Sequence, residues 1–274
     1  MSSISIIIAY LLDKYIRQSK IKQFYFRLIA RYSNLFTSKK PRSVKHIRQS
    51  FIFSIIPILA IGIALSVLFD NTIGYFFFFI FNTFIFCLAC DFYSWRNVPH
   101  NNADDKLISR TIHSFMTHQF ALVIYFLIMP SISGVVIYTL LNTSAQTIKK
   151  NNTESLVQFD VVDKMLFWLN LIPYSIMFVF ISLAGDFDST IYTLLKQKNK
   201  FKISSYYLEQ LLNQLVLNSV RKTDTDLNDE VNESGLTKNN VYEINFYNHV
   251  KALLFRAFIM IFICIIILSI VHEI

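Results

Sequence analysis

The feature that most constrains this chain is a set of long apolar stretches that carry almost no charge. Four of them lack Asp, Glu, Lys and Arg altogether, and a fifth contains only Arg256 near its start; they cover residues 51–69, 73–90, 120–141, 165–185 and 252–271. A bilayer core of roughly 30 Å needs about 20 helical residues to cross it, so each stretch is long enough to span. The sequence therefore predicts an all-α, polytopic membrane protein with about five transmembrane or membrane-embedded helices.

Composition supports this class and disfavours a soluble enzyme. Only 16% of the residues are charged, against roughly a quarter in soluble domains. Five Gly and five Pro among 274 residues provide few of the turn-forming residues that a many-stranded sheet requires. We expect residues 1–274 to form a single integral membrane domain whose main partner is the lipid bilayer.

The net charge of +8 comes from one end of the chain. Residues 13–49 contain eleven Lys and Arg, and Asp13 is their only acid. Because basic residues collect on the cytoplasmic side of membrane proteins, we expect a cytoplasmic amino terminus. No nucleic-acid-binding module is recognisable, and anionic lipid accounts for a basic excess beside a span, so we expect no nucleic-acid partner.

Within residues 1–49, apolar residues recur at helical spacing between basic ones and predict a basic amphipathic helix. The apolar positions are Ile21, Phe24, Tyr25, Leu28, Tyr32 and Leu35. Two interpretations stay open with equal weight. The helix either lies on the membrane surface and binds anionic headgroups, or packs on the other spans with a solvated basic face.

Two further regions have a predictable organisation. Residues 51–90 form a transmembrane hairpin, because only Asp70, Asn71 and Thr72 separate its two apolar stretches. Residues 186–251 combine an amphipathic helix over 204–220 with a polar, acid-rich linker over 222–240, on the cytoplasmic side in this topology. The final span follows at residues 252–271.

Residues that commonly carry chemistry do not form a recognisable motif. Cys87 and Cys90 have the C-x-x-C spacing, but they lie inside an apolar stretch, where packing is the preferred interpretation. His100, His113 and His118 share a loop with two acids at spacings that suit no zinc site. We find no nucleotide-binding or acyl-transfer motif, so we expect no metal and no cofactor, and catalytic residues stay unknown.

Proline and glycine inside the spans are more informative. Pro130 and Gly134 fall in the middle of the third stretch, and Pro173 in the middle of the fourth. Proline removes a backbone donor and clashes with the preceding turn, so residues 120–185 are expected to form two proline-kinked membrane helices. The kinks either frame a pocket or are plain structural bends, and Asn170 beside Pro173 is suited to an interhelical hydrogen bond.

Two carboxylates follow the fourth stretch. Asp186 and Asp188 could bind a cation or orient a substrate amine at the cytoplasmic mouth. The alternative is that this segment ends one helix and caps the next, with Asp188 or Ser189 as the cap. We prefer capping.

At these residues the chain resembles a known family. The run FALVIYFLIMPSISGVVIYTLL, with Gly134 four residues after Pro130 and Tyr138 four residues later, resembles the third hydrophobic region of the AmpE family. The run LNLIPYSIMFVFISLAGDFD resembles a later segment of that family. The order of apolar segments also fits.

The resemblance implies a multi-pass protein of the bacterial inner membrane. AmpE proteins are regulatory signalling modulators of β-lactamase induction, so it implies a membrane or cytoplasmic signalling partner and a role in cell-envelope stress. The residues it brings forward as ligand or signalling candidates are Pro130, Gly134, Tyr138, Asn170, Pro173, Asp186 and Asp188. A distant similarity to the CobD/CbiB proteins of cobalamin synthesis implies the alternative, a membrane-embedded amide-forming ligase.

Overall fold

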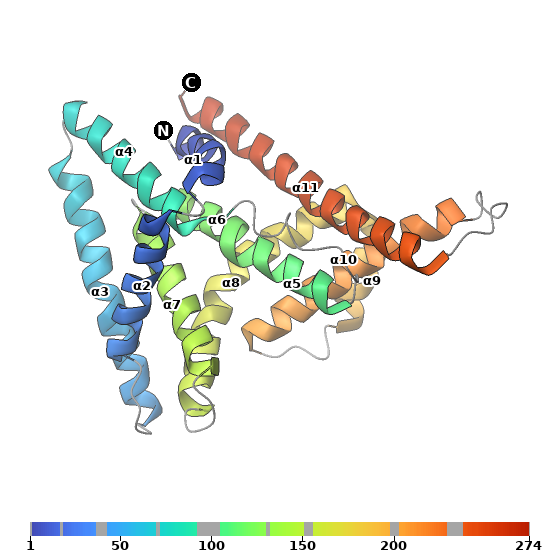
Figure 1. The fold of residues 1–274 in the computed structure, drawn as a ribbon, viewed down its shortest axis with the longest axis horizontal. Helices are drawn as coiled ribbons and strands as arrows, with labels where there is room; N and C mark the ends of the chain where they lie inside the picture. The colour runs from blue at the N-terminus through green and yellow to red at the C-terminus, as the bar shows by residue number, and fades with distance from the viewer. Residues whose placement is uncertain are drawn as a thin grey trace. The chain divides into compact units, whose positions relative to one another are not determined.

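The regular elements of this chain are helices (Figure 1). The computed structural model describes residues 2–16, 19–36, 43–69, 72–91, 105–129, 132–150, 156–197, 203–228 and 238–273, and no strand occurs among them. The predicted all-α class is confirmed. Backbone contacts group the chain into two compact units, where the sequence predicted one membrane domain: unit 1 is Met1–Tyr93 with Thr117–Asn170, and unit 2 is Ser94–Met116 with Leu171–Ile274.

Unit 1 is a bundle of antiparallel and crossing helices. Its elements are α1 (Ser2–Ile16), α2 (Lys20–Phe36), α3 (Val44–Leu68), α4 (Thr72–Ala89), most of the π-helix η1 (Met116–Phe120), α6 (Ala121–Ile128), α7 (Ser133–Lys150) and the first half of α8 (Leu156–Ala184). Helix α1 packs along α4, and α7 contacts α2, α3, α4 and α6 (Figure 1). Burial of apolar side chains from α3, α7 and α8 forms one hydrophobic core cluster of this unit, around Phe51, Leu141 and Val162.

Unit 2 is organised around a long amphipathic helix. Its elements are α5 (Asp105–Phe115), the second half of α8, α9 (Phe187–Gln197), α10 (Ser205–Asn228) and α11 (Lys238–Glu273). Helix α10 packs against α5, α9 and α11. The amphipathic helix predicted over 204–220 is confirmed, because its apolar face is buried at Leu208, Leu211, Leu212, Leu215 and Val220. The predicted polar linker over 222–240 is helical at both ends, since α10 continues to Asn228 and α11 begins at Lys238; residues 229–237 lie outside the described residues.

Among the described residues, four helical segments are long and apolar enough to cross a membrane, which supports a membrane protein. They are Val44–Leu68, Leu107–Ile128, Gln158–Ala184 and Phe246–Ile267. Three of these overlap the predicted first, fourth and fifth spans. Many large apolar side chains of α3 and α4 are exposed, including Phe53, Ile61, Phe76 and Phe81, as expected of surfaces that face lipid.

The third predicted span has a different structure. Helix α6 ends at Ile128, Met129 is extended with φ −89° and ψ 146°, and α7 starts at Ser133. A proline disfavours helical dihedrals in the residue before it, which explains the extended Met129 ahead of Pro130. Residues 120–141 are therefore not one kinked helix, and the apolar segment long enough to span begins upstream at Leu107.

The second predicted span is present as a shorter helix. Within α4, the segment Gly74–Ala89 is apolar but shorter than the four segments above. Helices α3 and α4 contact each other, and the rings of Phe69 and Phe78 stack with centroids 6.1 Å apart. This supports the predicted hairpin, whose tip at Asp70 and Asn71 lies outside the described residues.

Candidate functional site: a polar cavity beside a buried ion pair

Helix α2 turns polar residues toward the inside of unit 1. Its buried side chains are Lys22, Ile29 and Ser33, whereas Ile21, Phe24, Leu28 and Leu35 of the predicted apolar stripe are exposed. The Ser33 hydroxyl lies 2.7 Å from that of Ser144 in α7, and the Tyr32 hydroxyl donates to the carbonyl of Ser54 in α3. Of the two interpretations of this helix, packing on other helices holds for its buried face. That face is polar in part, and the apolar stripe points outward.

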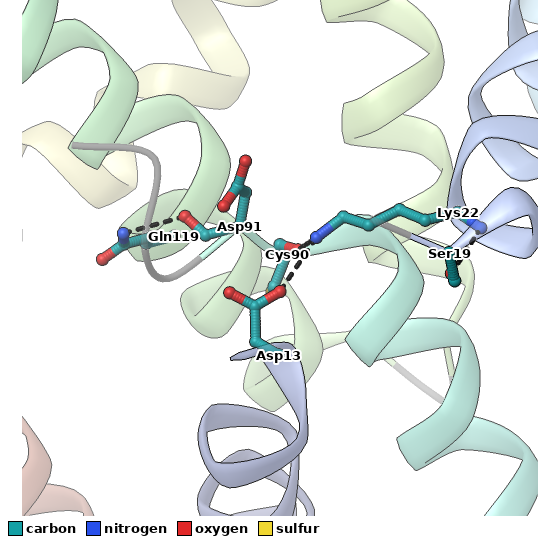
Figure 2. Close-up of polar contacts among 6 residues, drawn as sticks. All are labelled: Asp13, Ser19, Lys22, Cys90, Asp91 and Gln119. Carbon is teal, nitrogen blue, oxygen red and sulfur yellow. Dashed lines mark hydrogen bonds and ion pairs between the residues drawn. The ribbon is translucent and has the colours of Figure 1, made fainter. Parts of the chain in front are cut away.

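Lys22 forms a buried ion pair with Asp13. Its Nζ lies 2.9 Å from Asp13 Oδ1, and the two side chains are 6% and 0% exposed (Figure 2). Nζ also donates to the backbone carbonyl of Cys90, the residue after the end of α4. The last carbonyls of a helix lack intrahelical donors and carry partial negative charge, so an ammonium is a favourable partner there. Lys22 thus links the end of α1 to the end of α4.

The next residue, Asp91, forms hydrogen bonds to η1 through both its backbone N–H and its backbone carbonyl. Its N–H donates to the carbonyl of His118 at 3.1 Å, and Gln119 Nε2 donates to the Asp91 carbonyl at 2.9 Å (Figure 2). A π-helix is a rare, wide turn that occurs frequently at functional sites. Here it places Thr117, His118 and Gln119 against the carboxyl end of α4.

A cavity of about 340 Å³ opens next to the ion pair. Lys22 lies one helical turn before its wall residue Phe26, and Cys90 directly follows its wall residue Ala89. The wall is formed by Phe26, Arg27, Ala30, Ala89, Thr117, His118, Leu122, Tyr138, Thr139, Asn142, Thr143 and Gln146. This volume falls at the lower end of the range for small-molecule sites, about 300–1,000 Å³.

The cavity has a buried floor and an exposed mouth. Tyr138 and Thr117 are only 2% and 4% exposed, whereas Arg27 and Gln146 are exposed. Arg27 Nε donates to the Gln23 carbonyl one turn earlier in α2. Tyr25 contacts Thr139 of the wall, and burial raises the pKa of the Tyr25 phenol. The lining therefore offers hydroxyl, amide and imidazole groups along its depth and a guanidinium at its entrance.

Three predicted site residues belong to this cavity or support it. Tyr138 lines the floor, and its hydroxyl donates to Asn170 Oδ1 at 3.0 Å, as expected of Asn170 in an interhelical bond. The Tyr138 ring stacks on Tyr125 at 5.4 Å. The hydroxyl of Tyr125 in turn donates to the carbonyl of Leu169, which is the carbonyl left without a helical donor by Pro173 four residues later. Helix α8 continues through Pro173, and this hydrogen bond compensates for the proline.

Gly134 is a packing position. A Cβ on Gly134 would lie 2.6 Å from Met129 Cβ and 2.8 Å from the Tyr125 carbonyl oxygen, so only glycine allows α7 to start this close to the end of α6. Pro130 lies outside the described residues.

Asp186 and Asp188 lie in unit 2 and have a structural arrangement. Asp186 Oδ1 accepts the Asp188 N–H at 3.1 Å, and the Asp186 carbonyl accepts the N–H of Thr190. This is the geometry of a helix amino-terminal cap, so the cap of α9 is Asp186 and not Asp188 or Ser189 as predicted. Asp188 is exposed in the first turn of α9.

The histidines and cysteines do not gather into a metal site. His113 Nδ1 lies 3.2 Å from Glu209 Oε2 in unit 2, whereas His118 lines the cavity of unit 1; His100 lies outside the described residues. Among the residues that the structure describes, no three His, Cys, Asp or Glu side chains are placed to hold a metal ion. Cys87 and Cys90 are buried free thiols.

Sequence reasoning missed Lys22, Arg27 and the π-helix. One signal for the ion pair was available, because residues 13–49 contain eleven basic residues and Asp13 as the only acid, and Asp13 follows an apolar stretch that is too short to span. The π-helical turn has no comparable signature in the sequence. Fold and cavity together are those of a helical membrane protein with a cavity in one of its units. No family model, curated protein or solved structure matches the chain.

Proposed function

We propose that this chain is a regulatory membrane protein that senses a small polar molecule in the cavity of unit 1. The observation that carries the proposal is the cavity itself. It is about 340 Å³ in volume, and its inner surface is mostly apolar, but eight of the described residues that line it carry hydrogen-bonding side chains. It lies within a chain rich in membrane-length apolar helices. Polar groups inside such a protein are costly and commonly mark a binding site or pathway.

The proposal follows the resemblance to AmpE and makes the protein a signalling modulator of β-lactamase induction or of the response to cell-envelope stress. We place it in the bacterial inner membrane, with a cytoplasmic amino terminus and a membrane or cytoplasmic signalling partner. The exposed apolar stripe of α2 with Lys20 and Arg31 beside it suits contact with anionic headgroups.

The alternative, an amide-forming ligase, has less support. It would use Asp186, Asp188 or the histidines as working groups. Asp186 is engaged in capping α9, and His113 is paired with Glu209. A sensor needs only the binding groups that the cavity provides.

The test combines a gene deletion with variants of the cavity floor. We expect the deletion to change β-lactam susceptibility and β-lactamase induction, and the wild-type gene to restore both. Tyr138→Phe and Asn142→Leu should fail to restore them at normal protein levels in the membrane. Asp188→Asn, at an exposed position that is not a wall residue of the cavity, is the matched control and should restore them fully. Unchanged β-lactam responses in the deletion strain would refute the AmpE-type role.

A further inference from the structure

We infer that the cavity ligand carries an anionic group, a phosphate or a carboxylate, which the guanidinium of Arg27 binds at the mouth. This inference rests on the proposed function in one respect, namely that the cavity is a binding site. It adds the charge of the ligand, its orientation and the residue that recognises it.

The charge of the wall supports an anion. Among the described residues that line the cavity, Arg27 is the one with a formal charge at neutral pH, and none of them is Asp or Glu. The neighbouring ammonium of Lys22 is paired with Asp13 at 2.9 Å, so that pair is neutral as a whole. A cationic ligand would have to leave water beside a guanidinium without any carboxylate on the wall to compensate it.

The placement of the groups supports an orientation. Arg27 is exposed at the mouth, while Tyr138, Thr117 and Thr139 are buried deeper in the cavity. A guanidinium presents a planar fork that matches carboxylate and phosphate oxygens in a bidentate manner. The anionic group therefore stays near the aqueous entrance, where its desolvation costs least, and the uncharged polar part of the ligand contacts the hydroxyls and amides inside.

The anionic group can belong to a soluble molecule or to a lipid headgroup. Both present the same phosphate or carboxylate chemistry to Arg27, and the cavity lies in a unit whose α3 and α4 expose apolar side chains. A soluble ligand and a lipid headgroup give different results in thermal unfolding.

The first experiment measures the charge preference of the cavity without knowledge of the ligand. In the full chain with Cys264→Ser, a cysteine replaces Thr143, a half-buried wall residue. Its modification rates by an anionic and a cationic methanethiosulfonate reagent are compared in phosphatidylcholine nanodiscs, each relative to free cysteine. We expect the anionic reagent to be favoured by about tenfold, because one nearby unit charge acts through a partly shielded medium.

Arg27→Gln should abolish this preference, and Arg31→Gln should leave it unchanged. Arg31 is exposed one turn further along α2 and is not a wall residue, so it is the matched control. Asn142→Cys replaces Thr143→Cys if that variant does not fold. A rate ratio equal to that of free cysteine, or a preference that survives Arg27→Gln, would overturn the inference.

The second experiment identifies the source of the anion by thermal unfolding. A rise in unfolding temperature with glycerol 3-phosphate but not with glycerol, lost in Arg27→Gln and kept in Arg31→Gln, supports a soluble ligand. A rise only when phosphatidylglycerol replaces phosphatidylcholine, with the same dependence on Arg27, supports a headgroup. The absence of any Arg27-dependent rise contradicts an anionic ligand. If the deletion changes the β-lactam responses but no Arg27-dependent rise in unfolding temperature occurs, the anionic ligand is refuted and the proposed role stands. If the Arg27-dependent rise occurs but the deletion leaves the β-lactam responses unchanged, only the proposed role is refuted.

Discussion

At the scale of single residues, the buried pair of Lys22 and Asp13 is the most demanding feature of unit 1. Both charges are removed from water: the Lys22 ammonium donates to the Asp13 carboxylate and to the Cys90 carbonyl, and the Asp13 carboxylate is paired with Lys22. Removing one member of a buried pair leaves an uncompensated charge, which is far more harmful than replacing both members by apolar groups. The pair is thus a sensitive test of whether this junction is folded as described.

We predict that Asp13→Leu or Lys22→Met destabilises the protein strongly, by about 3–5 kcal/mol for each single variant. The double variant should be more stable than either single one, because no unpaired charge is left. Thermal or denaturant unfolding of the purified protein in detergent measures both effects.

The ion pair of Lys164 and Asp160 provides a control within the same unit. Its N···O distance is 2.7 Å, but its side chains are 53% and 59% exposed. Water screens such a pair, so Lys164→Met should change stability by about 0.5 kcal/mol or less. Equal losses for Lys22→Met and Lys164→Met would show that the Asp13–Lys22 pair is not buried in solution.

A second prediction at this scale concerns Gly134. We expect Gly134→Ala to destabilise the protein by about 1–3 kcal/mol, because the new methyl group overlaps Met129 and the Tyr125 carbonyl. Gly185→Ala should destabilise the protein less, because a Cβ on Gly185 would lie 3.1 Å from the nearest atom, Ser219 Cβ, and the neighbouring side chains can adjust. Unfolding temperatures of the two variants give the comparison, and the reverse order would contradict the tight α6–α7 junction.

At the scale of helices, α8 shows how a proline is accommodated inside a long helix. Pro173 lacks the N–H that would bond to the Leu169 carbonyl, and Tyr125 from α6 supplies a hydroxyl instead. The proline and the tyrosine are therefore energetically coupled although they do not need to touch.

A double-mutant cycle tests this coupling. Tyr125→Phe alone should cost about 1–3 kcal/mol, because it leaves a buried carbonyl without a donor. In the Pro173→Ala background the alanine N–H can bond to Leu169, so the same Tyr125→Phe change should cost at least about 1 kcal/mol less. Unfolding of the four proteins gives the coupling free energy, and strictly additive losses would contradict this account.

Helices also show what the sequence could and could not predict. The apolar face of α10 follows helical periodicity, so an amphipathic helix over 204–220 is predictable from sequence, and Leu208 and Leu212 on that face are buried. The prediction of the third span was wrong because the apolar sequence continues across Met129, whereas the helix ends before it. For α2, periodicity located the apolar stripe correctly but not the direction it faces, which depends on contacts of Lys22 and Ser33 with distant helices.

The same reasoning applies to the site. Asn170 was accessible to sequence reasoning because a polar group beside a proline in an apolar helix needs a partner, whereas Tyr138 came only from the resemblance to AmpE; the two side chains bond to each other. Arg27 looked like one of many basic residues, and its role depends on a cavity built by α2, α4, η1, α6 and α7. Sites assembled from residues distant in sequence leave no local pattern.

At the scale of the whole molecule, the open question is how often the chain crosses the bilayer, and α4 decides it. Its 18 residues extend about 27 Å at 1.5 Å per residue, close to the roughly 30 Å hydrocarbon thickness. If α4 crosses together with the four longer segments, the eleven Lys and Arg of residues 13–49 and the eight of residues 186–251 lie on the same side. If α4 does not cross, these two basic regions lie on opposite sides.

We predict that α4 crosses, because basic residues are retained on the cytoplasmic side during insertion. Reporter fusions after Lys149 and after His272 should then both give non-cytoplasmic signals, and a fusion after Lys196 in α9 a cytoplasmic one. Adding two lysines at the α3–α4 tip, after Asn71, should oppose translocation of the hairpin and reduce the non-cytoplasmic signal at His272. Cytoplasmic signals at both Lys149 and His272 in the unmodified chain would instead establish four crossings, with both ends of α4 on the same side of the membrane.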